Sequence, residues 1–227
     1  MANTMNRTKG GKQSRDMMES AYNQIREMIF LHRIFPGQKL TYRELSKELG
    51  MSLTPVQVAL GRLAQEGFVE RISNVGYYVK KINLKEIEDL YDIRKVIEVY
   101  AVELTVKKQT PGNIRVLKKC YLAHKNYLAQ IYDMKKLILD ADFHSQIAAI
   151  SGNHAAVRLL ERIFEHSRMY SPVELIPPGR LNVAASEHKQ IMQLIEERDV
   201  SGAMACMATH VQRAKEARIE MLAALPS

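Results

Sequence analysis

The sequence predicts a mostly α-helical protein: an N-terminal winged helix-turn-helix followed by a C-terminal antiparallel bundle of six helices. Two observations support this fold class. Residues 41–80 read as helix, turn, helix and a short two-stranded hairpin. After residue 82, apolar residues recur at helical spacing and no stretch alternates as a strand does. We therefore expect three parts: a flexible basic arm at 1–13, a winged helix-turn-helix domain at 14–81 and an all-α domain at 82–227.

The first elements are an arm and one helix. The arm lacks apolar periodicity and contains two consecutive glycines, so we expect it to be mobile. Its basic residues can touch phosphates or simply stay solvated. From Ser14 to about Arg33 an apolar stripe at helical spacing predicts a helix, which Phe35-Pro36-Gly37 ends.

The winged unit follows, with a start and stop signal for each helix. Thr41 is the expected N-cap of the first helix, with Glu44 in capping-box position, and Gly50 ends it. We expect Thr54 to cap the second helix, with Pro55 as its first residue. The segments FVERI and YYVKK, joined by SNVG, then predict the hairpin. Such a unit can place a helix in a DNA major groove. The alternative is a small helical subdomain used for protein contacts.

Composition and charge favour a cytoplasmic DNA-binding protein. The net charge of +8 is concentrated in residues 1–82, where 13 Lys and Arg against 7 Asp and Glu give +6. Neutralising DNA phosphates would use this charge. An apolar fraction of 46% can support two cores, yet no apolar run reaches the length of a membrane span. The N-terminus has no secretory signal, and Cys120 and Cys206 form no CxxC pair, as expected of reduced cytoplasmic thiols.

The segments FPGQKLT, YRELSKELGMSLTPVQVALGRLAQEGFVE and VGYYV resemble the N-terminal domain of GntR-family transcription regulators. The resemblance covers roughly residues 15–80. It implies a double-stranded DNA operator and a set of DNA-contacting residues: Arg43, Ser52, Leu53, Thr54, Gln57, Arg62, Asn74 and Gly76. The family usually has arginine where this chain has Leu53 and Gln57. Because arginine pairs bidentately with guanine, we expect a different operator or weaker direct readout.

The second half reads as six helices. Asn83 is the expected N-cap of the first, and Pro, Gly, Asp and Asn residues separate the others. The predicted helices span 84–108, 111–131, 134–150, 154–170, 181–198 and 200–224.

Four residues of this bundle can form a metal site. Asp140 and His144 share a helix face at i, i+4, and His188 and His210 lie on two later helices. Three imidazoles and a carboxylate suit a divalent transition metal: Zn, Ni, Mn or Fe. Spacing alone leaves open that these are structural or surface histidines, which is also our interpretation of His124.

The pattern D-x-x-F-H, E-H and H resembles the FCD-type ligand-binding domain of the FadR-like branch of the GntR family, in its smaller six-helix, VanR-like variety. The resemblance implies metal binding by Asp140, His144, His188 and His210. It also implies that Arg94 faces a pocket and holds a carboxylate effector. The alternative for Arg94 is a surface salt bridge with Glu98 at i+4.

These features favour a ligand-responsive transcription regulator over an enzyme. A homodimer would bind a pseudo-palindromic operator, and a small organic acid would bind at the metal and release repression. We expect no membrane partner. One alternative is a metal-dependent hydrolytic enzyme with a nucleic-acid-binding module. Another is a regulator whose metal is purely structural.

Overall fold

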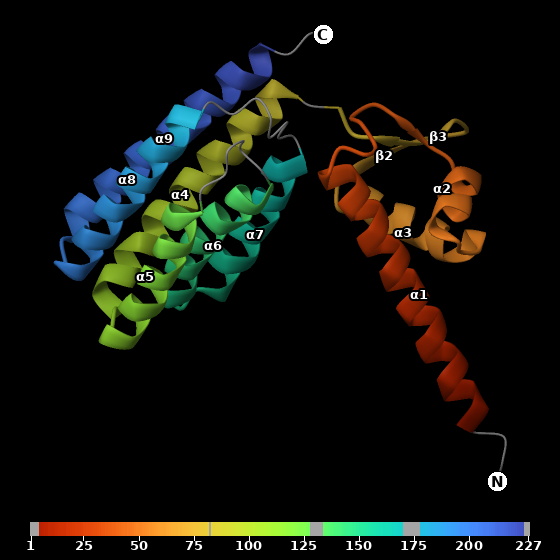
Figure 1. Cartoon of the computed structure of the whole chain (residues 1–227), viewed down its shortest axis with the longest axis horizontal. Helices are drawn as coiled ribbons and strands as arrows, with labels where there is room; N and C mark the ends of the chain where they lie inside the picture. Colours follow the sequence, from red (N-terminus) through yellow and green to blue (C-terminus); the bar gives the residue numbers. More distant parts are fainter. Residues whose placement is uncertain (1–4, 82, 128–133, 170–177, 225–227) are drawn as a thin grey trace. The chain divides into compact units, whose positions relative to one another are not determined.

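The computed structural model describes residues 5–81, 83–127, 134–169 and 178–224. Within these ranges, only the backbone is described for residues 5–13 and 178–182. The chain divides into two compact units, residues 1–82 and residues 83–227 (Figure 1). The described residues are mostly helical, with one small antiparallel sheet in the first unit. The predicted fold class is therefore confirmed.

Helix α1 spans Met5–Phe30 and packs on helix α3 (Leu53–Gln65). Its buried stripe includes Tyr22, Ile25 and Ile29, as the sequence predicts. The predicted boundary at residue 14 differs, because the backbone of residues 5–13 is already helical. No proline interrupts this stretch, so the helical hydrogen bonds continue through it. The first four residues of the expected arm lie outside the described residues.

Helix α2 (Tyr42–Leu49) has the predicted caps, and α3 does not. The Thr41 side chain accepts a hydrogen bond from the Glu44 backbone nitrogen, and Gly50 ends α2 with φ at 63°. The N-cap of α3 is Ser52, two residues before the predicted Thr54. Pro55 therefore occupies the third helical position. Proline is tolerated there because the first N–H groups of a helix have no intrahelical acceptor.

The wing is a three-stranded sheet in the order β1-β3-β2. Strands β2 (Val69–Ile72) and β3 (Gly76–Val79) form the predicted hairpin, and Asn74 adopts a φ of 60° in its turn. The sequence reading missed β1 (Lys39–Leu40), which pairs antiparallel with β3. Two residues are too few to show an alternating pattern, so only the pairing reveals this strand.

In the described part of the second unit six helices form the bundle. They are α4 (Leu84–Lys108), α5 (Pro111–Asn126), α6 (Met134–Ile150), α7 (His154–Met169), α8 (Pro178–Glu196) and α9 (Val200–Ala223). These bounds follow the predicted ones, except that α5 ends at Asn126 and α8 begins at Pro178; the predicted helical residues 128–131 and 170 lie outside the described residues. Asn83, Thr110 and Asp199 cap α4, α5 and α9 through their side chains.

Helix α4 is the central element of the bundle, since it packs against α9, α6 and α7. A core of Ala101, Ala141, Ala148, Leu160 and Phe164 joins α4, α6 and α7. The Thr105 hydroxyl, buried in α4, donates a 2.6 Å hydrogen bond to the Ile147 carbonyl of α6. The small alanines let these helices approach closely, which brings polar side chains from several helices together inside the bundle. None of the described helices is long and apolar enough to cross a membrane.

Candidate metal centre and DNA-contacting face

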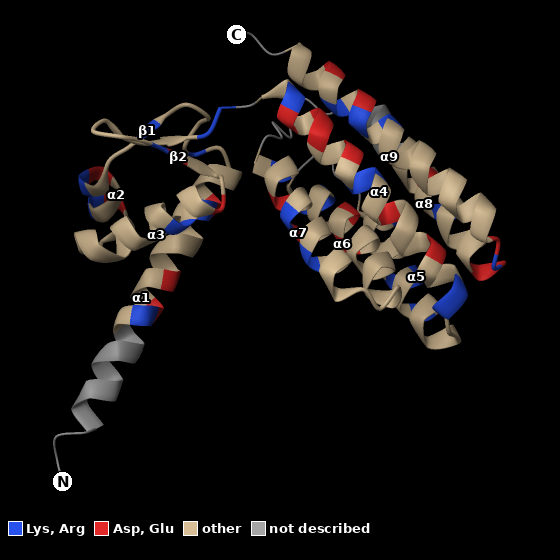
Figure 2. Ribbon diagram, turned by 180° about the vertical axis from the view of Figure 1, so that it is seen from behind, with Lys and Arg blue, Asp and Glu red and all other residues tan. Residues whose placement is uncertain are grey.

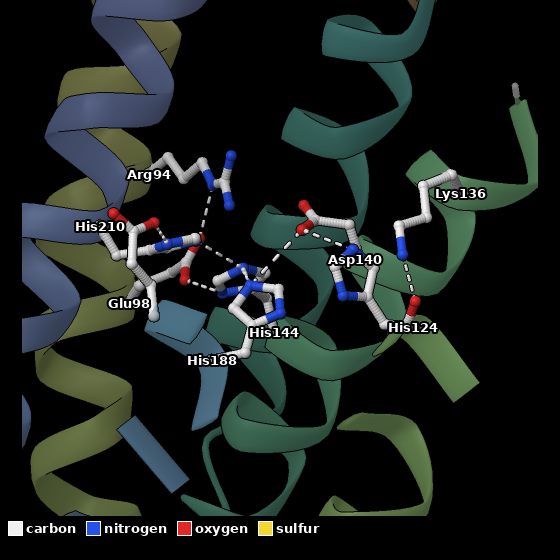
Figure 3. A network of polar contacts seen from close by, with 9 residues as sticks. Arg94, Glu98, His124, Lys136, Asp140, His144, His188 and His210 are labelled. Carbon is white, nitrogen blue, oxygen red and sulfur yellow. Dashed lines mark hydrogen bonds and ion pairs between the residues drawn. The ribbon is translucent and has the colours of Figure 1, made fainter. Parts of the chain in front are cut away.

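Three of the predicted ligands meet inside the bundle. His144 comes from α6, His188 from α8 and His210 from α9, and none is more than 2% exposed. The Nε2 atom of His144 lies 3.2 Å from that of His188 and 3.2 Å from that of His210 (Figure 3). Three segments separated in sequence thus direct three imidazole nitrogens at one point.

A buried carboxylate orients His144. Glu98 of α4 contacts Nδ1 of His144 through Oε2 and accepts a 2.6 Å bond from Nε of Arg94 through Oε1. Burial acts to raise the pKa of Glu98, but its contacts with His144 and Arg94 outweigh it and lower this pKa to about 2. Glu98 is therefore ionised and holds the Nδ1 edge of the imidazole ring.

A second carboxylate orients His210 in the same way. Glu187 of α8 lies 2.7 Å from Nδ1 of His210 through Oε2. Its other oxygen accepts a 2.9 Å hydrogen bond from Arg213 of α9. Carboxylate partners on the distal ring nitrogen are the usual support of metal-binding histidines, since they fix the tautomer and raise ligand basicity.

The donor set fits a metal ion. With a carboxylate at Nδ1, the proton of His144 and of His210 resides on Nδ1, and their Nε2 lone pairs face each other. Such an arrangement is unfavourable without a cation between the nitrogens. Around an ion with metal–nitrogen bonds of about 2.0–2.1 Å, adjacent donors lie roughly 2.9–3.4 Å apart for octahedral to tetrahedral angles. The 3.2 Å separations fall in this range.

The protonation states also suit metal binding. Burial is the largest cause of the lowered pKa of both His188 and His210, and neighbouring histidines lower it further. Burial acts to raise the pKa of Asp140, but the interactions with His144, His188 and Arg94 outweigh it and keep that pKa low. Neutral imidazoles and an ionised carboxylate are the forms that bind metals.

Asp140 lies at the His188 side of the cluster. Its Oδ1 is 3.5 Å from Nε2 of His188. The ligand atoms of Asp140, His188 and His124 all lie within 4.8 Å of one another. The ligand atoms of His144, His188 and His210 form a second such group. The structure therefore brings all four predicted ligands into one buried region, with His188 at its centre and Asp140 displaced toward α5.

Sequence reasoning missed Glu98, Glu187 and His124. Glu98 looked like half of a surface pair with Arg94, and Glu187 lies next to His188 in sequence and thus on another helix face. His124 had no sequence partner. The position of Glu187 directly before His188 hinted at a role in the site. It does not show that Glu187 contacts His210 of another helix.

Arg94 pairs with Glu98, but not at the surface. Both side chains are nearly fully buried, so the surface interpretation of this pair is wrong. The guanidinium carbon lies 4.7 Å from the ring centroid of Phe164. Nη2 of Arg94 is buried and has no hydrogen-bond partner among the residues that the structure describes. Arg94 thus keeps one donor group available inside the bundle.

In the first unit, most predicted DNA-contacting residues lie on the surface. Leu53 is 45% exposed at the start of α3, and Val58 of the same helix is 46% exposed. Ser52, Thr54, Gln57, Arg43 and Asn74 are also exposed, and Gly76 is half-buried at the start of β3. An exposed apolar residue at the tip of α3 can contact a thymine methyl group.

Arg62 is engaged within the protein. It forms ion pairs with Glu19 at 2.8 Å and Glu66 at 3.1 Å, and its guanidinium lies 3.7 Å over the Tyr22 ring. These contacts tie α3 to α1. The structure therefore gives Arg62 a packing role. Figure 2 shows further Lys and Arg residues on α2 and on the segment after β3, which includes Lys80 and Lys81.

Comparisons with known proteins agree with this architecture. Residues 89–213 match the FCD domain family, and residues 17–79 match the family described as bacterial regulatory proteins, gntR family. The Nta operon transcriptional regulator of Aminobacter aminovorans is 27% identical over 187 residues, which cover 82% of this chain and 87% of that protein. The HTH-type transcriptional repressor GlaR of Escherichia coli is 24% identical over 201 residues, which cover 84% and 90%.

Among solved structures, E. coli McbR/YncC has a TM-score of 0.73 at 21% identity and covers 90% of this chain and 97% of that one. At this identity the likeness concerns the fold. The matched families and relatives are transcription regulators and not enzymes, which argues against the hydrolytic alternative. The FCD match spans more than half of the chain and the gntR match covers its winged unit, so the chain belongs to the GntR family of DNA-binding transcription regulators and carries an FCD domain.

Proposed function

We propose that this regulator is a homodimeric repressor that binds a divalent transition metal in its helical unit and leaves its operator when a small carboxylic acid binds there. The observation that carries the proposal is that Nε2 of His144 lies 3.2 Å from Nε2 of His188 and 3.2 Å from Nε2 of His210, all three buried. A carboxylate contacts Nδ1 of His144 and another contacts Nδ1 of His210. A repressor is favoured because the relative GlaR is named as one. Binding DNA would place the protein in the cytoplasm.

The metal would be held by His144, His188 and His210, with Asp140 approaching from the His188 side. A bound Zn, Ni, Mn or Fe ion would supply Lewis-acid positions to which an oxygen ligand can coordinate. The residues of this chain do the rest. Glu98 and Glu187 fix the two outer imidazoles, so that the donors are arranged before the ion arrives.

The acid would be recognised by Arg94. Its Nε is occupied by Glu98, while its buried Nη2 has no partner among the described residues and remains available for a carboxylate oxygen. A charged hydrogen bond in a buried site is stronger than one in water, because the local dielectric constant is low. An acid bridging Arg94 and the metal would connect α4 to α6, α8 and α9, and could thereby favour one arrangement of the bundle.

A second copy of the chain is the expected partner of α4. Ile93, Val96 and Tyr100 are 55%, 65% and 46% exposed, at a spacing that gives one apolar stripe along this helix. Two-fold symmetry is the usual state of helix-turn-helix regulators, because two reading helices then meet two half-sites of one operator. Packing the stripe of one chain against that of a second copy would bury these apolar side chains and would place the two DNA-reading helices about a two-fold axis.

The test combines metal analysis with a thermal-shift screen of small carboxylic acids. We expect the purified protein to hold one divalent ion per chain and to gain stability from particular acids only when the ion is present. At an acid concentration of one hundred times Kd the gain would be about 2.7 kcal/mol. The same acids should weaken binding to operator DNA. Arg94→Met is the matched variant, and it should bind metal but not acid.

The structural-metal alternative gives a different result. In that case chelation lowers the melting temperature, but no acid changes the melting temperature or the affinity for DNA. A protein that holds no ion after growth or reconstitution with Zn, Ni, Mn and Fe would refute the metal part of the proposal. DNA binding would be unaffected by that failure.

A further inference from the structure

His124 is a buried imidazole that the proposed metal site does not use. It lies on α5, its side chain is fully buried, and neither Nδ1 nor Nε2 has a hydrogen-bond partner among the described residues. Burying polar atoms without partners costs free energy, and such atoms in a native protein call for an unseen water or ion. A leucine or phenylalanine would fill the same space without this cost.

The His124 ring is directed toward the centre. Its Nε2 lies 3.8 Å from Oδ1 of Asp140, and its ring centroid lies 4.8 Å from that of His188 (Figure 3). Donor atoms of His124, Asp140 and His188 all lie within 4.8 Å of one another. Two imidazoles and one carboxylate are a common donor set for divalent transition metals.

The surroundings of His124 hold it in place without using its ring nitrogens. The buried Lys136 of α6 donates a hydrogen bond to the backbone carbonyl of His124, which ties α5 to α6. The ring nitrogens of His124 therefore remain available to an ion.

We propose that the centre contains two overlapping donor sets: the first set of His144, His188 and His210, and a second set of His124, Asp140 and His188. His188 belongs to both. Because its Nε2 has one lone pair, a single ion occupies one set at a time. The inference rests on the proposed function, since it assigns a second position to the same metal. An ion in the second set is coordinated by one oxygen and two nitrogens instead of three nitrogens.

The experiment removes the first set and asks whether His124 then matters. Affinity for Co²⁺ is measured by competition with a chromogenic chelator, and the visible spectrum of bound Co²⁺ reports the donor set. His210→Phe disables the first set and leaves the second intact. We expect this variant to bind one Co²⁺ with a changed spectrum. Adding His124→Phe should weaken that binding about tenfold or more, because the loss of even an outer-shell partner of a metal ligand usually costs that much.

Two controls separate a ligand role from a packing role. Tyr121→Phe removes a polar group from a buried side chain of the same helix and should leave Co²⁺ affinity unchanged in the His210→Phe background. The melting temperature of the metal-free protein should not fall with His124→Phe, because the change removes unpartnered polar atoms and keeps a ring of similar size. If His210→Phe does not fold, His144→Phe disables the first set instead.

The outcomes are distinct. If wild-type protein binds no Co²⁺, the proposed metal function fails. If wild-type protein binds Co²⁺ but the double variant binds it as tightly as His210→Phe alone, the second set is refuted while the proposed function stands. Loss of all binding in His210→Phe, with folding retained, also refutes the second set.

Discussion

Replacing Glu98 with glutamine tests the centre of the helical unit. Glu98 is 1% exposed and lies between the Arg94 guanidinium and the His144 ring. Glutamine has nearly the same shape and can still accept a hydrogen bond from Nδ1 of His144. It removes the negative charge, however, and leaves a buried guanidinium without its counter-ion.

Two routes give the size of the effect. The pKa of Glu98 falls from 4.5 to about 2, because His144 and Arg94 outweigh the opposing effect of burial, and this shift corresponds to about 3 kcal/mol. Removing one partner of a buried ion pair usually costs about 3–5 kcal/mol. We expect Glu98→Gln to lower the free energy of unfolding of the metal-free protein by about 3 kcal/mol. The melting temperature should then fall by roughly 10 °C.

The assay is urea unfolding after chelation, with metal affinity measured separately. Arg94→Met combined with Glu98→Gln leaves no unpaired buried charge, so the double variant should be more stable than Glu98→Gln alone. Metal affinity should fall about tenfold or more in both variants, because the carboxylate no longer raises the basicity of His144. A single variant as stable as wild type, or a double variant no more stable than the single, would refute the assignment of a buried ion pair.

Three further predictions concern the winged helix-turn-helix unit and the expected dimer. Arg43→Ala should lower the slope of DNA affinity against salt concentration by about one phosphate contact. Arg62→Ala should leave this slope unchanged and lower the free energy of unfolding by about 0.5–1 kcal/mol. Fluorescence anisotropy over a salt series and urea unfolding measure the two quantities, and the reverse pattern would mean that Arg62 binds phosphate. Burial and a hydrogen bond to Glu66 raise the pKa of Tyr22 to about 12, so its contribution to stability is complete below pH 10 and is lost as pH rises toward 12. Tyr22→Phe should flatten stability over this interval. An ultraviolet titration of wild type should show a late tyrosine that Tyr22→Phe removes, and an unchanged titration in the variant would contradict the hydrogen bond. Val96→Glu should convert the expected dimer to a monomer that still binds metal and has a lower affinity for operator DNA. Light scattering measures the mass and a DNA titration measures the affinity. An unchanged mass would show that the α4 stripe is not the dimer interface.

The sequence by itself determined the local structure of this protein. Most helix bounds, the caps at Thr41 and Asn83, and the hairpin turn at Asn74 depend on residues close together in the chain. The helical periodicity also predicted which faces are buried, and therefore the two-domain fold class. The start of α3 was misplaced because Ser52, Thr54 and Pro55 all carry start signals, and local preferences do not rank them.

Only the tertiary structure decided how the site is built. Glu98 serves His144 of another helix, Glu187 serves His210, and His124 meets Asp140, although no spacing in the sequence links these pairs. Burial likewise turned the Arg94–Glu98 pair from a surface feature into an internal one. Periodicity indicates which side of a helix faces inward. Which helix lies opposite, and at what height, depends on packing among all six, so partners across helices appear only when the bundle is assembled.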